Sequence, residues 1–278
     1  MTRPLILHQL NAVDLSPVEF IKLAATNTCE KVTLFGFEGG SVLPRSNTGL
    51  HYPTVVTEAT IKDVQRALAD TGVAVDGVEF FPLTADVDLN RYIPALVRAR
   101  ELGARRAVSH IFIEDDVLVV DKLGQLCELA QAEGLVLSAE FCPLTPGNPS
   151  LERAIWLVDQ VGCDRFGIGV DALHLIRSGS TAEDIEKLNA RYFGVVQICD
   201  AIGAHTSTDY IADVHNREVP GQGDLPLIDI LNAVPASIPL EIEVPAAHRR
   251  KSGITAAEHV RDVVTATRSI LANVVPGR

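Results

Sequence analysis

Four apolar segments in the second half of the chain carry an acid or an amide at or near their carboxyl end. Glu140 follows LVLSA, Asp171 follows FGIGV, Gln197 lies in GVVQIC, and Glu243 lies in LEIEV. Carboxylate and amide oxygens are ligands for hard divalent cations, and carboxylates also serve as general acids and bases. The four residues are candidates for one site if the fold brings the ends of these segments together.

Each of these residues alone has a simpler explanation. A carboxylate at the end of a strand is often exposed to solvent or caps the following helix. Glu241, on the same face as Glu243, could be a structural ion-pair partner. Three carboxylates in a narrow space would repel one another, so at least one would stay protonated unless a cation were present. Oxygen ligands without a thiolate favour one Mn²⁺ or Mg²⁺ ion over Zn²⁺.

Four similar junctions indicate how the chain positions these segments. A helix-like run ends in glycine in ADTGVAV, RELGARR, QAEGLVL and DQVGCDR, at Gly72, Gly103, Gly134 and Gly162. Glycine after a helix takes the left-handed conformation without a Cβ clash, so these are predicted helix ends that lead into strands. Their separations of 31, 31 and 28 residues are close to the length of one strand-helix unit.

Eight apolar segments are predicted strands, and a helical candidate follows each of them. The segments are LILHQL (5–10), KVTLFG (31–36), VAVDGVEFF (73–81), RAVSHIF (106–112), LVLSAEF (135–141), FGIGVD (166–171), GVVQIC (194–199) and LEIEV (240–244). Eight such units fit a (β/α)8 TIM barrel, an α/β fold of typically about 250 residues. An open doubly wound sheet usually carries a GxGxxG turn, and none follows a strand here. No linker-like stretch divides the chain, so residues 1–278 are expected to form a single domain.

The composition of the chain restricts the classes of partner that it can bind. The formal net charge of −12 disfavours nucleic acid, because phosphate neutralisation needs a surface rich in Lys and Arg. The five cysteines form no CxxC pair, which indicates neither a disulfide framework nor a thiolate zinc site. The sequence has no bilayer-spanning apolar segment and no signal-peptide pattern, so we expect no membrane contact and a cytoplasmic location.

The motifs AEFCP, VDALHLIRSG, VVQICDA, VPGQGDLPL and LEIEVP, in this order, resemble the xylose isomerase-like TIM-barrel superfamily, in its sugar phosphate isomerase/epimerase branch. The likeness extends over nearly the whole chain, but its specific motifs lie in the second half. In that family Glu, Asp, His and Glu from strands 5 to 8 hold a divalent metal. The resemblance places these ligands on Glu140, Asp171, Gln197 and Glu243. Gln197 departs from the pattern, because many members have His there.

The resemblance also implies catalytic roles. Glu140 and Glu243 would act as general bases on opposite faces of the substrate, and His174 would hydrogen-bond a substrate oxygen. Arg217, before the PGQG turn, would bind a substrate oxyanion or phosphate. The implied reaction is isomerisation or epimerisation of a keto sugar or related polyol ketone, by proton abstraction next to a metal-bound carbonyl. Family members often form dimers or tetramers, so a homo-oligomer is a further expectation.

Three alternatives stay open. Loss of a β-hydroxyl during the same chemistry would make the protein a dehydratase or lyase of a keto-polyol, of the inosose or dehydroshikimate type. The Gln at position 197 also leaves open a non-catalytic barrel subunit of a larger complex. An abasic-site endonuclease shares the fold, but it needs more His ligands in the first half than His8 and His110. These two residues and Glu79 are not assigned to the site, because a lone His on an apolar strand is usually a hydrogen-bonded core residue.

Overall fold

Eight parallel strands close into a barrel in the computed structural model, which describes residues 4–38, 54–203 and 210–275. The strands follow one another in chain order, and β8 pairs with β1 to close the barrel. They are β1 (Leu5–His8), β2 (Lys31–Phe35), β3 (Ala74–Glu79), β4 (Arg106–His110), β5 (Val136–Glu140), β6 (Phe166–Asp171), β7 (Phe193–Ile198) and β8 (Leu240–Ile242). The predicted (β/α)8 architecture is confirmed.

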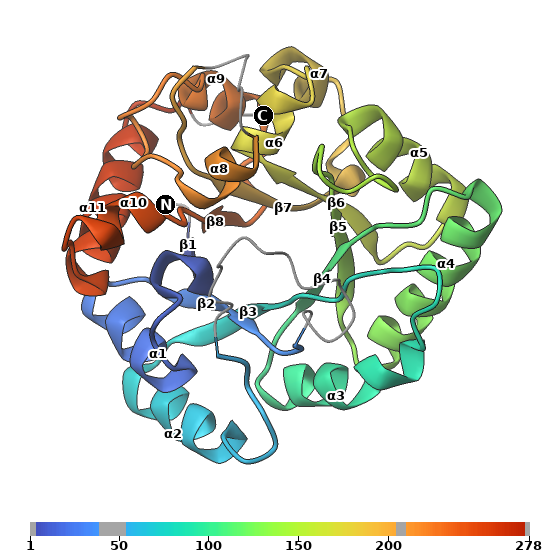
Figure 1. Ribbon diagram of the computed structural model, residues 1–278, viewed down its shortest axis with the longest axis horizontal. Helices are drawn as coiled ribbons and strands as arrows, with labels where there is room; N and C mark the ends of the chain where they lie inside the picture. Colours follow the sequence, from blue (N-terminus) through green and yellow to red (C-terminus); the bar gives the residue numbers. More distant parts are fainter. Residues whose placement is uncertain (1–3, 39–53, 204–209, 276–278) are drawn as a thin grey trace.

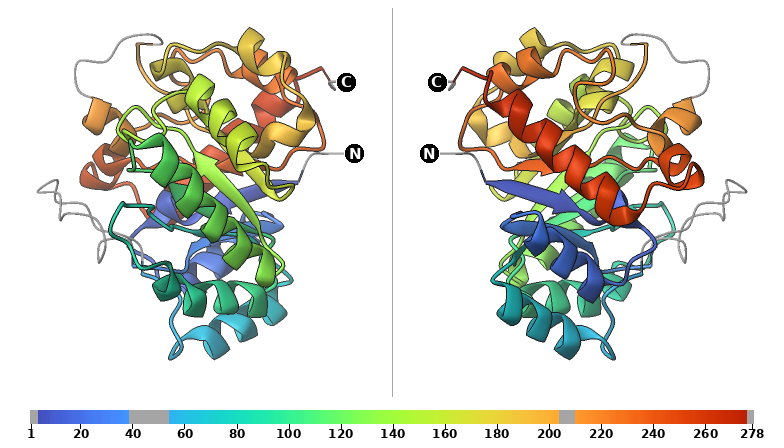
Figure 2. Two further views of the ribbon diagram at one scale, coloured as in Figure 1. Left: turned by 90° about the vertical axis from the view of Figure 1, so that its right-hand side faces the viewer. Right: turned by 90° about the vertical axis from the view of Figure 1, so that its left-hand side faces the viewer.

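Helices form a ring outside the barrel (Figures 1 and 2). The α-helices are α1 (Pro17–Thr26), α2 (Ile61–Thr71), α3 (Ile93–Glu101), α4 (Asp116–Ala132), α5 (Leu151–Val161), α6 (Ala172–Arg177), α7 (Ala182–Glu186), α8 (Tyr210–His215), α9 (Leu227–Ala233), α10 (Ala247–Lys251) and α11 (Ala256–Leu271). Apolar side chains from helices and strands, such as Phe20, Leu34 and Leu96, form one buried cluster, and burial of such surface drives folding. Among the described helices, none has both the length and the apolar character needed to cross a membrane.

The helix ends follow the local signals in the sequence. Gly72 and Gly162 come directly after α2 and α5, with φ of 73° and 61°. These values lie in the left-handed region, where a residue with a Cβ would be strained. Gly103 and Gly134 have similar φ values shortly after α3 and α4. The predicted helix-to-strand junctions are confirmed.

Several strands end earlier than the apolar pattern predicts. The run 73–81 gives β3 only as far as Glu79, and Phe80 and Phe81 are buried in the following loop. LEIEV likewise ends as a strand at Ile242, so Glu243 lies one residue beyond β8. An apolar run indicates burial, and burial continues past the last strand residue wherever a loop packs over the barrel.

Polar groups and small residues fill part of the lumen. Arg106, at the start of β4, pairs with Asp76 of β3 and donates to the carbonyl oxygen of Gly194 on β7 at 3.3 Å. This last bond crosses the lumen, because β4 and β7 are not neighbours. Nearby, a Cβ added to Gly167 would lie 2.8 Å from the backbone nitrogen of Gly194. The strands approach one another so closely here that glycine is required.

Side chains hold the main chain where β8 has ended. The Nδ2 of Asn11 donates to the carbonyl oxygen of Ile242 at 2.7 Å, and its Oδ1 accepts from the Val244 nitrogen at 3.1 Å. The Nε2 of His259, on α11, lies 2.8 Å from the carbonyl oxygen of Val244. These bonds satisfy buried peptide groups on both sides of Glu243. Glu243 is therefore held firmly although it lies outside the strand.

Gly167→Ala should destabilise the barrel. The new Cβ would meet the backbone of Gly194, which cannot move without disturbing β7. Overpacking of this kind costs about 1–3 kcal/mol in the free energy of unfolding, measurable by urea denaturation. Gly124→Ala, in the middle of α4 with nothing within 4 Å of the added Cβ, is the matched control. This control should raise the free energy of unfolding by up to about 1 kcal/mol. Equal stability of Gly167→Ala and wild type would contradict the packing described.

The free energy of unfolding should depend on pH through His259. Burial lowers the pKa of this imidazole to about 4 from a usual value of 6.5. Between these pH values the unfolded chain binds a proton that the folded chain does not, so stability rises with pH. His259→Gln should remove up to about 3 kcal/mol of this rise, measured by urea unfolding from pH 4 to 7. His248→Gln, at a partly exposed histidine, should keep the wild-type slope.

Candidate functional site

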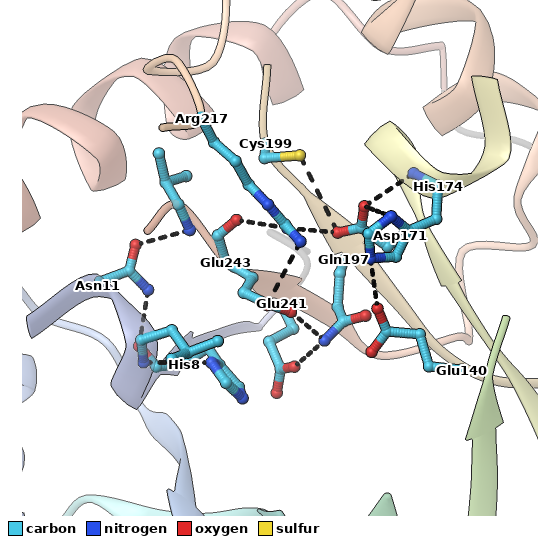
Figure 3. A network of polar contacts seen from close by, with 12 residues as sticks. His8, Asn11, Glu140, Asp171, His174, Gln197, Cys199, Arg217, Glu241 and Glu243 are labelled. Carbon is cyan, nitrogen blue, oxygen red and sulfur yellow. Dashed lines mark hydrogen bonds and ion pairs between the residues drawn. The ribbon is translucent and has the colours of Figure 1, made fainter. Parts of the chain in front are cut away.

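The four residues predicted to be metal ligands meet at the carboxyl ends of neighbouring strands (Figure 3). Glu140 and Asp171 are the last residues of β5 and β6, Gln197 is the next-to-last residue of β7, and Glu243 follows β8. All four are buried. One carboxylate oxygen from each of the three acids lies within 4.8 Å of the others. The structure thus brings together the residues that the sequence pattern placed in one site.

Glu140 is surrounded by cationic or proton-donating groups. Its Oε1 lies 3.0 Å from Nε2 of His174, and its Oε2 lies 3.6 Å from Nε2 of His110. Burial by itself would raise the pKa of Glu140, but His110, His174 and Arg217 outweigh it and lower the pKa to about 2. Glu140 is therefore ionised at neutral pH and able to accept a proton or a cation.

Asp171 both caps a helix and belongs to the site. Its Oδ1 accepts from the backbone nitrogen of His174 at 3.1 Å, as the N-cap of α6. Its Oδ2 lies 2.7 Å from Nη1 of Arg217. The capping and the functional interpretations of this residue are therefore compatible. The helix that Asp171 caps also carries His174 toward Glu140, so one short segment positions two site residues.

Arg217 is a fully buried guanidinium between two of the acids. Besides its bond to Asp171, its Nη1 donates to the carbonyl oxygen of Glu243 at 3.0 Å, and its Nη2 lies 3.6 Å from Glu243 Oε1. Burial raises the pKa of Glu243, Arg217 offsets only part of that effect, and the pKa reaches about 8. The sequence-based role of Arg217, contact with substrate, stays a prediction, because here its Nη groups bind protein carboxylates.

Among the described residues, the side chain of Gln197 forms hydrogen bonds only through its nitrogen. Its Nε2 donates to Oε1 of Glu241 at 3.0 Å and also to Oε2 of Glu243. Its Oε1 is buried and has no hydrogen-bond partner among the described residues. A buried amide oxygen without a partner is rare in folded proteins and calls for a ligand or a water.

The first half of the barrel supplies residues that the sequence-based prediction did not assign to the site. His8 ends β1 and lies 3.0 Å from Oε2 of Glu79, which ends β3. One ligand atom each from His8, Glu241 and Glu243 lies within 4.8 Å of the others. Burial disfavours the charged imidazole, but Glu79, Glu243 and Glu241 raise the pKa of His8 to about 10. The position of His8 and Glu79 at strand ends is the signal in the sequence that could have found them.

Aromatic rings lie beside these first-half residues. Phe35 is 5.8 Å from the His8 ring and 6.4 Å from Phe80, and Phe80 is 5.3 Å from His110, measured between ring centroids. The aromatic rings lie in or directly after β1 to β4, whereas the acids predicted as ligands lie in or directly after β5 to β8. The first half of the barrel therefore contributes aromatic rings and Glu79, and the second half contributes the three acids predicted as ligands.

The donor set fits a divalent cation. Three carboxylates converge, and the unpartnered oxygen of Gln197 belongs to a side chain that bonds one of them. Oxygen ligands of this kind are typical of hard ions such as Mg²⁺ and Mn²⁺. Positive charge would also relieve the repulsion between the buried acids. The residues present are thus compatible with the metal that the sequence pattern predicts.

Known proteins share both sequence features and the fold of this chain. A family model for the xylose isomerase-like TIM barrel matches residues 29–266. No curated protein matches the sequence at a significant level. Among solved structures, that of the IolI protein with a binding zinc atom has a TM-score of 0.78 and 16% identity, covering 98% of this chain and 99% of the other.

Two further solved structures have similar scores. A xylose isomerase domain protein from Alicyclobacillus acidocaldarius has a TM-score of 0.72 and 18% identity, covering 96% of this chain and 97% of the other. A D-psicose 3-epimerase from Clostridium cellulolyticum H10, solved with D-tagatose, has a TM-score of 0.71 and 14% identity, covering 96% and 99%.

At such identities the solved structures establish a shared fold. The family model carries more weight, because it is a match in sequence and extends over most of the chain, including all four predicted ligands. The resemblance stated from the motifs is confirmed: the chain belongs to the xylose isomerase-like TIM barrel family.

Proposed function

We propose that this protein is a metal-dependent isomerase or epimerase of a keto sugar or a related polyol ketone. The observation that carries the proposal is the convergence of Glu140, Asp171 and Glu243 within 4.8 Å, beside the unpartnered oxygen of Gln197. These four residues would hold one divalent ion, Mn²⁺ or Mg²⁺. Such an ion, when bound, acts as a Lewis acid on a carbonyl oxygen and makes the neighbouring carbon more acidic.

The two glutamates supply the proton transfers. Their surroundings separate their pKa values, about 2 for Glu140 and about 8 for Glu243, and such separation is typical of acid–base pairs. Glu140, which is ionised, takes the proton from the carbon next to the carbonyl. Return of a proton to the opposite face of that carbon by Glu243 inverts it, which is epimerisation. Return of the proton to the adjacent carbon is isomerisation.

His174 and Arg217 orient these carboxylates and the substrate. Nε2 of His174 lies 3.0 Å from Oε1 of Glu140 and so fixes the orientation of this carboxylate. Arg217 fixes Asp171 and Glu243 together, and its Nε is buried without a hydrogen-bond partner among the described residues. Both residues carry N–H groups within the site, so each is suited to bind a hydroxyl or carbonyl oxygen of the substrate.

The structurally similar epimerases support this class of reaction. The D-psicose 3-epimerase with D-tagatose and an L-ribulose 3-epimerase both share the fold of this chain, with TM-scores of 0.71 and 0.70. The sugars in their names are ketoses, in which a carbonyl adjoins carbons that bear hydroxyls. A small carbohydrate or polyol ketone is therefore the substrate class we assign to this protein.

Proton exchange tests the proposal even where the product is unidentified. The protein with Mn²⁺ should catalyse incorporation of deuterium from D₂O next to the carbonyl of at least one member of a panel of ketoses, inososes and keto-glycosides. Glu140→Gln should lower this exchange rate roughly 10²–10⁴-fold, because the base is lost. NMR follows both the exchange and the products.

Matched variants make the exchange experiment specific. Glu186→Gln, at an exposed glutamate of α7, should exchange at the wild-type rate. Loss of water from a substrate, instead of exchange or inversion, would assign the dehydratase alternative. No exchange with any compound by a folded, Mn²⁺-loaded protein would refute the proposed enzyme and favour a non-catalytic barrel.

Mn²⁺ affinity should rise with pH between about 6 and 8. A carboxyl group must lose its proton to bind a metal, and the pKa of Glu243 is about 8, so metal binding competes with its proton over this range. Glu243→Gln should lower the Mn²⁺ affinity at least about tenfold and flatten the pH dependence. Isothermal titration calorimetry of the metal-free protein with Mn²⁺ measures the affinity and its dependence on pH. Glu186→Gln should retain the wild-type pH profile, and a pH-independent wild-type affinity would contradict the assignment of Glu243 as a ligand.

A further inference from the structure

A chain of three buried side chains ends at the unpartnered oxygen of Gln197. Thr33 of β2 donates its hydroxyl to Oε2 of Glu241 on β8. Oε1 of Glu241 then accepts from Nε2 of Gln197 at 3.0 Å. These residues are fully or almost fully buried. The contacts connect three strands through the lumen, so the amide of Gln197 has a fixed environment on its nitrogen side.

This environment determines which way the amide points. An amide nitrogen can only donate, and the nitrogen of Gln197 donates to both Glu241 and Glu243. The oxygen then has to face away from them. In Figure 3 the nitrogen of Gln197 is directed toward Glu241, and its oxygen is on the side where Glu140 lies. The reverse orientation would set the amide oxygen against Oε1 of Glu241 and would lose the hydrogen bond that the nitrogen donates to it.

The orientation gives the site a uniform set of donors. Glu140, Asp171 and Glu243 contribute carboxylate oxygens, and Gln197 contributes an amide oxygen. The neighbouring imidazole of His174 is engaged with Glu140 through Nε2. A set of four oxygen donors such as these suits Mg²⁺ and Mn²⁺, whereas Zn²⁺ gains more from imidazole and thiolate ligands.

We propose that Gln197, held by the Thr33–Glu241 pair with its oxygen on the side where Glu140 lies, shifts the metal preference of this protein away from Zn²⁺ and toward Mn²⁺ and Mg²⁺. Glu241 is the positioning residue of this arrangement, because its Oε1 accepts from the nitrogen of the amide. The inference rests on the proposed metal site, and it adds a determinant of metal selectivity to it.

The selectivity is tested by competition on the metal-free protein. MnCl₂ and ZnCl₂ are titrated separately against a chelating dye, and the ratio of the two dissociation constants is the readout. Gln197→His exchanges the amide oxygen for an imidazole nitrogen and should raise the preference for Zn²⁺ over Mn²⁺ at least about tenfold. Gln197→Leu has a side chain of similar size without any donor atom. It should weaken the binding of both ions and change the ratio of the two dissociation constants far less.

Glu241→Gln tests the positioning role. A glutamine at this position can present either an oxygen or an NH₂ group, so the amide of Gln197 is no longer forced into one orientation. Loss of such support around a ligand typically costs about 10–100-fold in metal affinity, and this is the loss of Mn²⁺ affinity that we expect. Thermal unfolding of each metal-free variant shows whether it is folded. In a folded Glu241→Gln protein a lower Mn²⁺ affinity reflects the site and not the stability of the barrel.

The outcomes separate this inference from the proposed function. If wild type binds Mn²⁺ but Gln197→His leaves the ratio within about twofold, the selectivity inference is wrong and the metal site stands. Wild-type Mn²⁺ affinity in Glu241→Gln would likewise overturn the positioning role alone. If the folded wild-type protein binds neither ion, both the metal-dependent function and this inference fail.

Discussion

Repulsion between buried carboxylates is the constraint that shapes the mouth of this barrel. Oxygens of Glu140, Asp171 and Glu243 lie within 4.8 Å of one another, in a place that water hardly reaches. Such a group is stable only if cations, protons or amide donors compensate the charge. The protein uses all three: Arg217 lies against Asp171 and Glu243, the raised pKa of Glu243 keeps a proton there, and Gln197 donates to Glu243.

These compensating groups require a rigid scaffold, because each works only over a short distance. The closed barrel provides this scaffold. Contacts beyond the end of β8 additionally hold Glu243 in place. Asn11 bonds peptide groups on both sides of Glu243, and His259 bonds the next carbonyl. A residue after the end of a strand would ordinarily have the freedom of a loop. Here Glu243 keeps one backbone hydrogen bond to Ile198 of β7, and side chains from the 3-10 helix after β1 (Gln9–Ala12) and from α11 bond the peptide groups beside it.

The fold could be predicted from the sequence almost completely, and the site only in part. Glycine junctions and apolar runs are local signals, so the eight strands and their order followed from them. The four residues predicted as ligands were singled out because they lie at or near the ends of strands in the second half. His8 and Glu79 also end strands. They were not assigned to the site, because a lone histidine on an apolar strand is rarely a functional residue. That His8 meets Glu79 depends on how the strands are staggered around the closed barrel, which no local pattern contains.

Position 197 illustrates why contacts across the lumen matter more than residue type alone. From the sequence, a glutamine among acids is simply a weaker ligand than the histidine of related proteins. In the structure its one nitrogen serves both Glu241 and Glu243, and its oxygen stays available. A neutral imidazole carries a single N–H and cannot donate to both carboxylates while its other nitrogen binds a metal. The amide therefore meets two demands at once, one from the buried acids and one from the site, and this explains its presence in physical terms.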